Sequence, residues 1–210
     1  MWRGTTAGDR AAARRAQLIE VGIELLGEKG ATGITVRELY ARAQLNPRYF
    51  YESFADLDAL LVAIFDQLLA ELVVEVRRAV EAADENEPAK TRAAIETAFG
   101  YLTDDPRRIR ILLTDALGST VLAQRRSEFV RIGARNMAEQ AARFYGIPAD
   151  ARLLRSTTYL LAGGLVELLI AWQNGTLELT VQELIDDASE LVSGVGDAAR
   201  AIAERRRAGR

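Results

Sequence analysis

The chain has 210 residues, of which 49% are apolar, and it carries a formal net charge of −3. This length allows one large or two modest domains with a buried core, and the apolar content excludes a disordered chain. Because the sequence contains neither Cys nor His, it also excludes disulfides, thiolate or imidazole metal sites and a histidine general base.

Apolar residues recur at helical spacing along nearly the whole chain, and no strand pattern is evident, which predicts an all-α fold. No signal-peptide pattern follows Met1. The longest apolar stretch, residues 159–172, is interrupted by Glu167 before it reaches the roughly 18 residues that cross a bilayer. We therefore expect a cytoplasmic protein that has no membrane partner.

The charge is unevenly distributed along the chain. Residues 1–55 carry a balance of +2 and the remainder a balance of −5, which is the sign expected for a protein with one end facing DNA. The first helix is predicted at residues 9–29, ended by Gly30. Four arginines are expected to form a basic arm before it: Arg3, Arg10, Arg14 and Arg15. Such an arm can reach phosphates or a minor groove of DNA, and a solvated tail is an equally good interpretation.

Residues 34–54 predict two short helices joined by a tight turn. Thr35 and Glu38 form a capping-box pattern, so the first of these helices begins near Val36. Asn46 is a favourable N-cap for the second helix, and Pro47 suits its first position because the missing N–H does no harm there. This spacing is typical of a helix-turn-helix, in which the second helix lies in the major groove of DNA.

The second helix has an apolar face and a polar face. Phe50 and Phe54 are four residues apart and are expected to pack inward, which leaves Arg48, Tyr49 and Tyr51 toward the outside. Arginine can bond guanine or phosphate with two donors, and a tyrosine hydroxyl can hold a phosphate. An ordinary helical hairpin with a solvated polar face remains the alternative interpretation.

The rest of the chain predicts longer helices. The first is predicted to start at residue 56 and run past residue 80, and the next to open at residues 86–88. The others are predicted at residues 106–117, 121–145, 151–174 and 181–203, the last with a second capping box at Thr180 and Glu183. The helix at residues 151–174 is apolar around nearly its whole girth, which indicates burial on more than one side. We expect it and the last helix to pair with their copies across a two-fold axis, in a four-helix homodimer interface, although a monomer core helix is the alternative. The candidate contacts are Leu161, Leu165, Leu168 and Trp172.

The N-terminal pattern closely resembles the tetracycline-repressor (TetR) family of bacterial transcriptional regulators. The resemblance lies in Arg14-Arg15-Ala16-Gln17-Leu18-Ile19, Gly22, Glu28-Lys29-Gly30, Thr35-Val36-Arg37-Glu38-Leu39, Tyr49-Phe50-Tyr51, Phe54 and Ala59-Leu60-Leu61. It covers about the first sixty-five residues strongly and continues weakly through Gly163-Gly164 to Trp172. The resemblance implies DNA contacts at Thr35, Arg37, Asn46, Pro47, Arg48, Tyr49, Tyr51 and Ser53.

Three positions depart from the family pattern. Gln44 stands where many members have Gly in the turn, and Leu57 stands where many have a phosphate-binding Lys. Asp56 and Asp58 flank Leu57 and would repel phosphate, unless they serve as helix caps. Asp56 as an N-cap is the preferred interpretation.

The resemblance also implies an effector pocket in the second domain. The many apolar residues suggest a small hydrophobic or amphipathic effector, and we expect no cofactor and no metal. Asn136 and Gln140 are expected on an inward-facing stripe of their helix. Polar or aromatic side chains among apolar neighbours give a search area of Phe99, Tyr101, Asp115, Asn136, Gln140, Tyr159 and Glu167.

The sequence therefore predicts two domains, a helix-turn-helix domain at residues 1–55 and an effector-binding and dimerisation domain at residues 56–210. The leading hypothesis is a ligand-responsive repressor that binds a near-palindromic operator as a homodimer. A helical dimer that binds small molecules or proteins and has lost DNA contact is the second hypothesis. An all-helical enzyme is the third, and the absence of Cys and His disfavours it.

Overall fold

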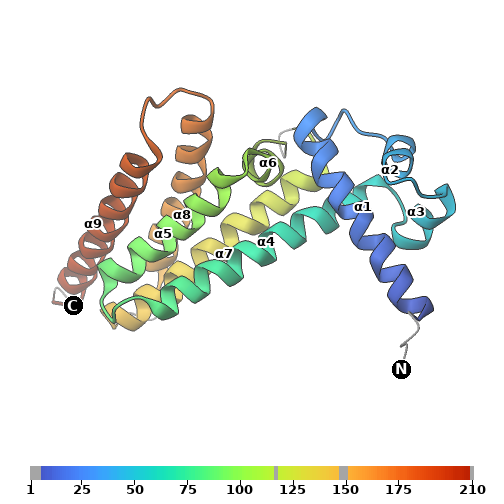
Figure 1. Cartoon of the computed structure of the whole chain (residues 1–210). Helices are drawn as coiled ribbons and strands as arrows, with labels where there is room; N and C mark the ends of the chain where they lie inside the picture. Colours follow the sequence, from blue (N-terminus) through green and yellow to red (C-terminus); the bar gives the residue numbers. More distant parts are fainter. Residues whose placement is uncertain (1–5, 116–117, 147–150, 209–210) are drawn as a thin grey trace. The chain divides into compact units, whose positions relative to one another are not determined.

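The computed structural model describes residues 6–115, 118–146 and 151–208, and all regular structure within these ranges is helical (Figure 1). The predicted all-α fold is confirmed. The elements are α1 (Ala7–Lys29), α2 (Val36–Arg42), α3 (Pro47–Ser53), α4 (Leu57–Ala82), α5 (Glu87–Asp104), α6 (Pro106–Ile109), the π-helical turn η1 (Arg110–Thr114), α7 (Thr120–Tyr145), α8 (Arg152–Gln173) and α9 (Val181–Ala208).

The chain folds into two compact units. The first contains the residues up to Ala70 together with Asp105–Arg126, and the second contains Glu71–Asp104 together with the residues from Ser127 onward. The helices α4 and α7 each contribute residues to both units. The packing thus divides α4 after Ala70, whereas the sequence prediction ended the first domain at residue 55.

Helix α1 begins earlier than predicted because Thr6 and Asp9 form a capping box. The Thr6 hydroxyl accepts a hydrogen bond from the Asp9 N–H, and the Asp9 carboxylate accepts one from the Thr6 N–H at 2.8 Å. The prediction of a basic arm before the helix is therefore wrong for Arg10, Arg14 and Arg15, which all lie within α1. Arg3 lies outside the described residues.

The core of the first unit forms where α1 packs against the start of α4. The two helices approach closely at Gly22, where an added Cβ would lie 2.5 Å from Ile64 Cδ1, so no larger residue fits without a shift. The side chains that fill this core are fully buried and include Leu18, Leu25, Leu26, Leu39, Phe50, Leu60 and Phe65. Their burial gives the first unit an apolar core that holds the short helices in place.

The end of α1 is held by η1 through a set of polar bonds, which we call the α1–η1 contact. Arg110 Nη1 donates to the Gly27 carbonyl at 2.9 Å, and Asp115 Oδ2 accepts from the Ala31 N–H at 3.1 Å. Gly30 lies between these bonds with φ of 73°, a conformation that favours glycine, and an added Cβ there would lie 2.6 Å from Arg110 Nη2. The segment 105–115 therefore belongs to the unit that contains α1.

The segment after Asp105 differs from the prediction. A single helix was expected over residues 106–117, but α6 ends at Ile109 and the backbone continues as the π-helical turn η1. Asp105 caps α6, since its Oδ1 accepts from the Arg107 N–H at 3.0 Å. Residues 116–117 lie outside the described part of the chain.

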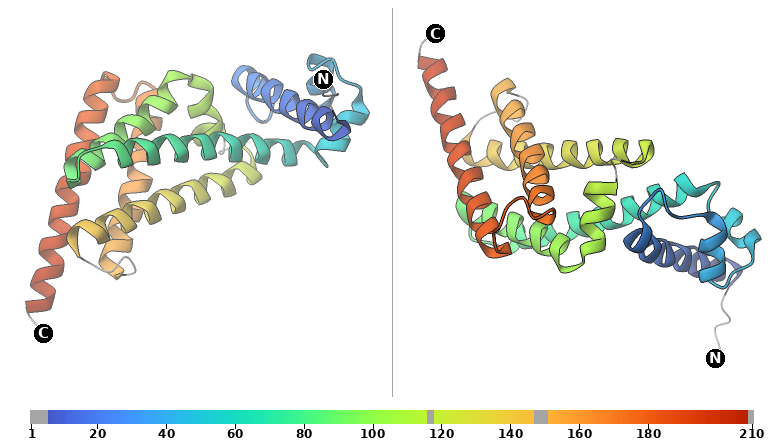
Figure 2. Two further views of the ribbon diagram at one scale, coloured as in Figure 1. Left: turned by 60° about the horizontal axis from the view of Figure 1, so that its bottom comes forward. Right: turned by 90° about the horizontal axis from the view of Figure 1, so that it is seen from above.

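In the second unit, α5 packs against α9, and α9 also packs against α8 (Figures 1 and 2). The predicted capping box before α9 is confirmed, because Thr180 and Glu183 exchange hydrogen bonds in both directions. A smaller apolar cluster joins α7 to the first turns of α8 around Ala138 and Leu154. These contacts order the unit and leave part of α8 and α9 uncovered.

Helix α8 buries one stripe and exposes the opposite one. Leu154, Ala162 and Val166 are buried, whereas the Leu160 side chain is 72% exposed. By length and composition alone α8 is able to cross a membrane, contrary to the sequence prediction, and only 28% of its most apolar window is buried within the chain. The exposed stripe therefore has no cover from the described part of the chain.

The four predicted dimer contacts lie beside the buried stripe of α8. Leu161, Leu165, Leu168 and Trp172 are all half-buried, and the Trp172 Nε1–H donates to the Leu179 carbonyl at 2.8 Å. Their packing within the chain leaves them less available to a partner than Leu160. Whether they touch a second copy remains a prediction.

Candidate nucleic-acid interface

Helix α3 begins and is anchored as the sequence predicts. Asn46 Oδ1 accepts from the Arg48 N–H at 3.0 Å, and Pro47 occupies the first turn. Phe50 is fully buried and Phe54 nearly so, with ring centroids 5.9 Å apart. Burying two aromatic rings on one side of a seven-residue helix fixes which side faces outward.

The outward side of α3 carries the predicted polar and aromatic groups. The Arg48 side chain is 81% exposed and Tyr51 is 62% exposed, while Pro47 also faces solvent. Tyr51 meets the buried Phe50 ring edge-on at 5.3 Å between centroids, so its ring is supported although its surface is open. An arginine and a tyrosine held outward on a short capped helix suit hydrogen bonding to bases and phosphates.

Two residues that the sequence reasoning did not single out as binding residues support this surface. Glu52 Oε1 pairs with Arg48 Nε at 2.7 Å, and Glu52 Oε2 lies 3.8 Å from Arg14 Nη2. The Arg14 guanidinium also lies over the half-buried Tyr49 ring, 4.2 Å from its centroid. The spacing of four residues between Arg48 and Glu52 was a visible signal for an ion pair on one helix face.

The turn before α3 is strained at Gln44. Its φ of 53° is the one positive value among the described residues other than glycine. A side chain in this left-handed conformation costs about 1–2 kcal/mol, which a glycine at this position would avoid. Gln17 Nε2 donates to the neighbouring Ala43 carbonyl at 2.9 Å, which ties this turn to α1.

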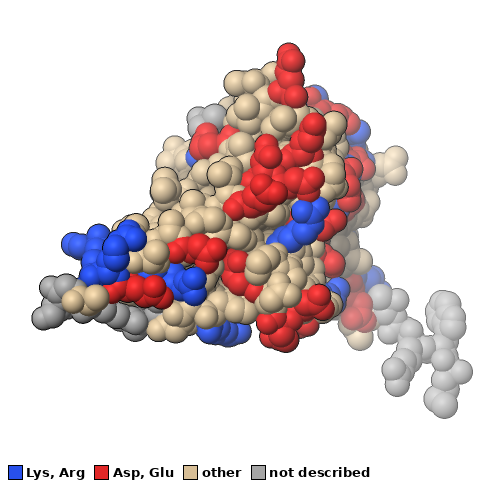
Figure 3. All heavy atoms as spheres, turned by 90° about the vertical axis from the view of Figure 1, so that its left-hand side faces the viewer, with Lys and Arg blue, Asp and Glu red and all other residues tan. Residues whose placement is uncertain are grey.

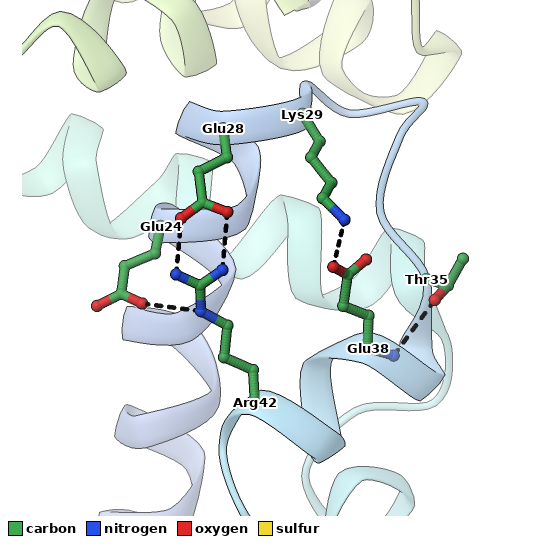
Figure 4. A network of polar contacts seen from close by, with 6 residues as sticks. All are labelled: Glu24, Glu28, Lys29, Thr35, Glu38 and Arg42. Carbon is green, nitrogen blue, oxygen red and sulfur yellow. Dashed lines mark hydrogen bonds and ion pairs between the residues drawn. The ribbon is translucent and has the colours of Figure 1, made fainter.

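Thr35 caps α2 through one half of the predicted capping box. Its hydroxyl accepts from the Glu38 N–H at 3.2 Å. The Glu38 carboxylate pairs with Lys29 rather than reaching back to the Thr35 N–H, so the reciprocal half of the prediction is wrong (Figure 4). The ion pair with α1 satisfies the Glu38 carboxylate instead.

A second ion-pair group joins the end of α2 to α1. Arg42 donates two hydrogen bonds to the Glu28 carboxylate, at 2.6 and 2.7 Å, and its Nε lies 3.5 Å from Glu24 (Figure 4). The hydrogen bonds from Arg42 lower the pKa of Glu28, and the same bonds raise the pKa of Arg42. This pairing keeps the two helices together and takes Arg42 out of the set of cations available to DNA.

Two further predicted contact residues lie on the same unit. Arg37 on α2 is exposed. Ser53 is half-buried at the end of α3, and its hydroxyl donates to the Tyr49 carbonyl at 2.9 Å.

Asp56 caps α4 as predicted, because its Oδ1 accepts from the Ala59 N–H at 2.8 Å. Leu57 is half-buried in the first turn of α4.

The seven candidate effector residues do not form one cluster. Asp115 belongs to the first unit, where it pairs with Arg110, and burial raises the pKa of its carboxyl. The other six lie in the second unit, where Phe99 is buried and the Tyr101 hydroxyl donates to Glu71 at 2.9 Å. The exposed members are Asn136, Tyr159 and Glu167, and Gln140 is half-buried.

The prediction of an inward-facing stripe on α7 is wrong for Asn136, because the buried positions of this helix are Leu122, Ala134 and Ala138. Membership of an effector pocket stays a prediction for all seven residues.

Comparisons with known proteins agree with this geometry at the N-terminal end. The sequence profile described as bacterial regulatory proteins, tetR family, matches residues 18–64. An HTH-type transcriptional regulator of Haemophilus influenzae, itself named as uncharacterized, is 25% identical over 120 residues, which cover 56% of this chain and 57% of that protein. The HTH-type transcriptional regulator BetI of Brucella canis is 32% identical over 82 residues, covering 39% of this chain and 40% of BetI.

The matches thus cover 57% of the length of the first of these curated relatives and 40% of the length of the second. Among solved structures, the transcriptional regulator FadR of Bacillus subtilis in complex with stearoyl-CoA superposes with a TM-score of 0.69 at 16% identity. That superposition covers 84% of this chain and 96% of FadR. A likeness of this kind extends the shared fold beyond the N-terminal helices.

Proposed function

We propose, from the premise that residues 18–64 belong to the tetR family of bacterial regulatory proteins, that the chain is a DNA-binding transcriptional regulator. It acts in the cytoplasm as a repressor that a small molecule releases from its operator. The observation that carries the proposal is the outward face of α3, where Arg48 and Tyr51 are exposed above the buried Phe50 and Phe54.

In this proposal α3 enters the major groove. Arg48 bonds base edges, with Pro47 and Tyr49 beside it at the start of the helix, and Tyr51 holds a phosphate. Thr35 and Arg37 at the start of α2 and Ser53 at the end of α3 lie against the sugar-phosphate backbone, while Asn46 orients the first turn of α3 as its cap.

We further propose that the chain is a homodimer joined through α8 and α9. The large exposed side chains of these helices are Leu160, 72% exposed, and Leu191, 62% exposed. Gly164 and Gly194 have open space where a Cβ would point, so a second helix can approach closely there. Covering such leucines is favourable by about 25 cal/mol per Å² of apolar area.

The charged side chains on the surface limit how far the proposed dimer interface extends. Acidic side chains gather on the face seen in Figure 3, with surface that carries no Lys, Arg, Asp or Glu between them. An interface between identical surfaces is self-complementary under two-fold symmetry, so its centre must be the uncharged part. Leu160, Gly164, Leu191 and Gly194 are exposed and uncharged and are proposed as such a centre.

A two-fold dimer carries two copies of α3, which reach a near-palindromic operator when they are roughly 34 Å apart. We propose that the effector prefers a state with a different spacing, and that α4, which has residues in both units, transmits the change. A coupling free energy of about 1–3 kcal/mol would change operator affinity by about 5- to 150-fold.

The effector is proposed as a small hydrophobic or amphipathic molecule. The stearoyl-CoA bound by the Bacillus subtilis FadR supports this chemical class, since that protein shares the fold. A library of acyl-CoA thioesters and amphipathic cations, screened for release of the protein from DNA, tests the class. An effector that leaves operator affinity unchanged at fixed salt concentration contradicts the two-state mechanism.

A gel-shift titration on the DNA directly upstream of the protein's own gene tests DNA binding. We expect nanomolar, salt-sensitive binding to a near-palindrome. Arg48→Ala should weaken it by about 1–3 kcal/mol at sites with the preferred base, and Arg77→Ala, an exposed arginine of α4 in the second unit, serves as the control. Equal affinities of the parent and the Arg48 variant remove Arg48 from the interface.

The second candidate function is a helical dimer that has lost DNA contact. It is favoured by Leu57 in place of a cationic side chain and by the carboxylate of Glu52 on the outward face of α3. Absence of binding to genomic fragments at low salt concentration, with a stable dimer and a bound small molecule, would select this alternative.

A further inference from the structure

Glu52 occupies a position that the proposed DNA contacts leave unexplained. It lies on α3, one helical turn after Arg48, and its side chain, 39% exposed, contacts two guanidinium groups. A carboxylate on a surface that faces phosphates weakens binding through charge repulsion. A residue of this kind on a recognition helix therefore calls for a function that offsets the repulsion.

The first contact fixes one edge of the Arg48 side chain. Glu52 Oε1 accepts from Arg48 Nε at 2.7 Å. A guanidinium has five N–H donors in one rigid plane, so engaging Nε sets the plane and leaves the donors of the two terminal nitrogens directed outward. The Arg48 side chain is 81% exposed, and those donors face solvent.

The second contact fixes Glu52 itself. Glu52 Oε2 lies 3.8 Å from Arg14 Nη2, and the Arg14 guanidinium stacks over the Tyr49 ring at 4.2 Å. Arg14 comes from the middle of α1 and is only 25% exposed, so it offers a fixed rather than a mobile partner. The carboxylate thus joins a supported cation on α1 to the exposed cation on α3.

We infer that Glu52 is a positioning residue that orients the Arg48 guanidinium to form two hydrogen bonds with the O6 and N7 atoms of a guanine. The inference rests on the proposed DNA-binding function and adds to it the base and the orienting group. Guanine is the base because its major-groove edge presents two adjacent acceptors that match the two outward donors. The carboxylate lowers affinity for phosphates in general and raises discrimination at one base pair per half-site.

Glu52→Gln is the informative variant, because it keeps the side-chain shape and removes the charge. The full-length parent, Glu52→Gln and Arg48→Ala are each used to select binding sites from one library of random duplexes. Glu81→Gln is the matched control, since Glu81 also pairs at a spacing of four residues with an arginine Nε, that of Arg77 on α4. Thermal unfolding of each variant checks that the fold is kept.

We expect the parent to select a near-palindrome with a guanine in each half-site that Arg48→Ala no longer selects. Glu52→Gln should lose preference for that same guanine, by about three- to tenfold, and keep the preferences at other positions. Its affinity for a duplex of unrelated sequence should be unchanged or increased, since a negative charge has been removed. A general loss of α3 structure would instead weaken every position together.

A Glu52 variant that selects the parental site with the parental guanine preference overturns the inference and leaves the proposed function intact. Uniform weakening at all positions in Glu52→Gln overturns it as well. A parent protein that enriches no sequence and binds no duplex at low salt concentration contradicts the proposed function, and the inference with it.

Discussion

The helix-turn-helix and the α8–α9 surface differ in where their stabilising contacts come from. The short helices α2 and α3 are capped by Thr35 and Asn46 and are anchored by Phe50, all within one chain. Helix α8 is three times as long as α3 and more apolar, yet its Leu160 side is open to solvent. The contacts that stabilise the helix-turn-helix therefore all lie within one chain. The exposed side of α8, in contrast, needs a partner surface to cover it.

The largest effect is expected from Phe50→Ala, which empties the core beneath α3. Removing a fully buried phenylalanine costs about 3–5 kcal/mol of the free energy of unfolding. Chemical denaturation monitored by circular dichroism measures the loss, with the exposed Tyr51→Ala as control, for which we expect less than about 0.5 kcal/mol. Equal losses in both variants would show that α3 is not anchored through Phe50.

Leu160→Glu tests the other region and should leave the stability of the first unit unchanged. A carboxylate at the centre of the proposed interface is expected to halve the mass seen by analytical ultracentrifugation and to weaken operator binding about a hundredfold or more, because the two α3 helices no longer act together. Ala70→Glu, which places the same charge on an exposed position of α4, is the control. A dimer that survives both Leu160→Glu and Leu191→Glu places the interface elsewhere.

A smaller effect, of opposite sign, is expected at the turn. Gln44→Gly relieves a left-handed backbone conformation and should raise the free energy of unfolding by about 0.5–1 kcal/mol after the extra flexibility of the unfolded chain is subtracted. Differential scanning calorimetry measures the shift in Tm. An unchanged or lowered Tm would mean that the Gln44 side chain contributes contacts that offset the strain.

The smallest effect is expected in the pH dependence of the free energy of unfolding. Arg42 lowers the pKa of Glu28 in the folded state, so the ion pair stabilises the fold above the unfolded value of 4.5 and its contribution is lost as pH falls through the folded pKa. The stability difference between the parent and Arg42→Gln should therefore shrink below about pH 4.5. Denaturation curves at several pH values measure it, and a difference that stays constant down to pH 3 contradicts the assignment.

The sequence predicted best what depends on neighbouring residues. Asn46 with Pro47, and Thr180 with Glu183, marked the starts of α3 and α9 because caps act within one turn of a helix. Phe50 and Phe54 identified the buried side of α3 because they are four residues apart, which places both large apolar rings on the same face of the helix.

Contacts between distant residues were beyond the sequence pattern. The Glu38 carboxylate had two available partners, and only the position of Lys29 on α1 decides between them. Arg14 supports α3 through Tyr49 and Glu52, residues 35 and 38 positions away, which no local rule connects. Arg110 and Asp115, at the π-helical turn η1, bond Gly27 and Ala31, which are 83 and 84 positions away in the sequence.

The α1–η1 contact has a consequence for protein engineering. A chimaera joined after residue 55, with its second part taken from another regulator, would lack Arg110 and Asp115 and would leave the Gly27 carbonyl and the Ala31 N–H without these partners. Ile109, Ile111 and Leu112 are fully buried and would be missing as well. A biosensor that uses the helix-turn-helix of this protein therefore also needs residues 105–115. The N-terminal segment and this later segment belong to one compact unit, although they are separate in the sequence.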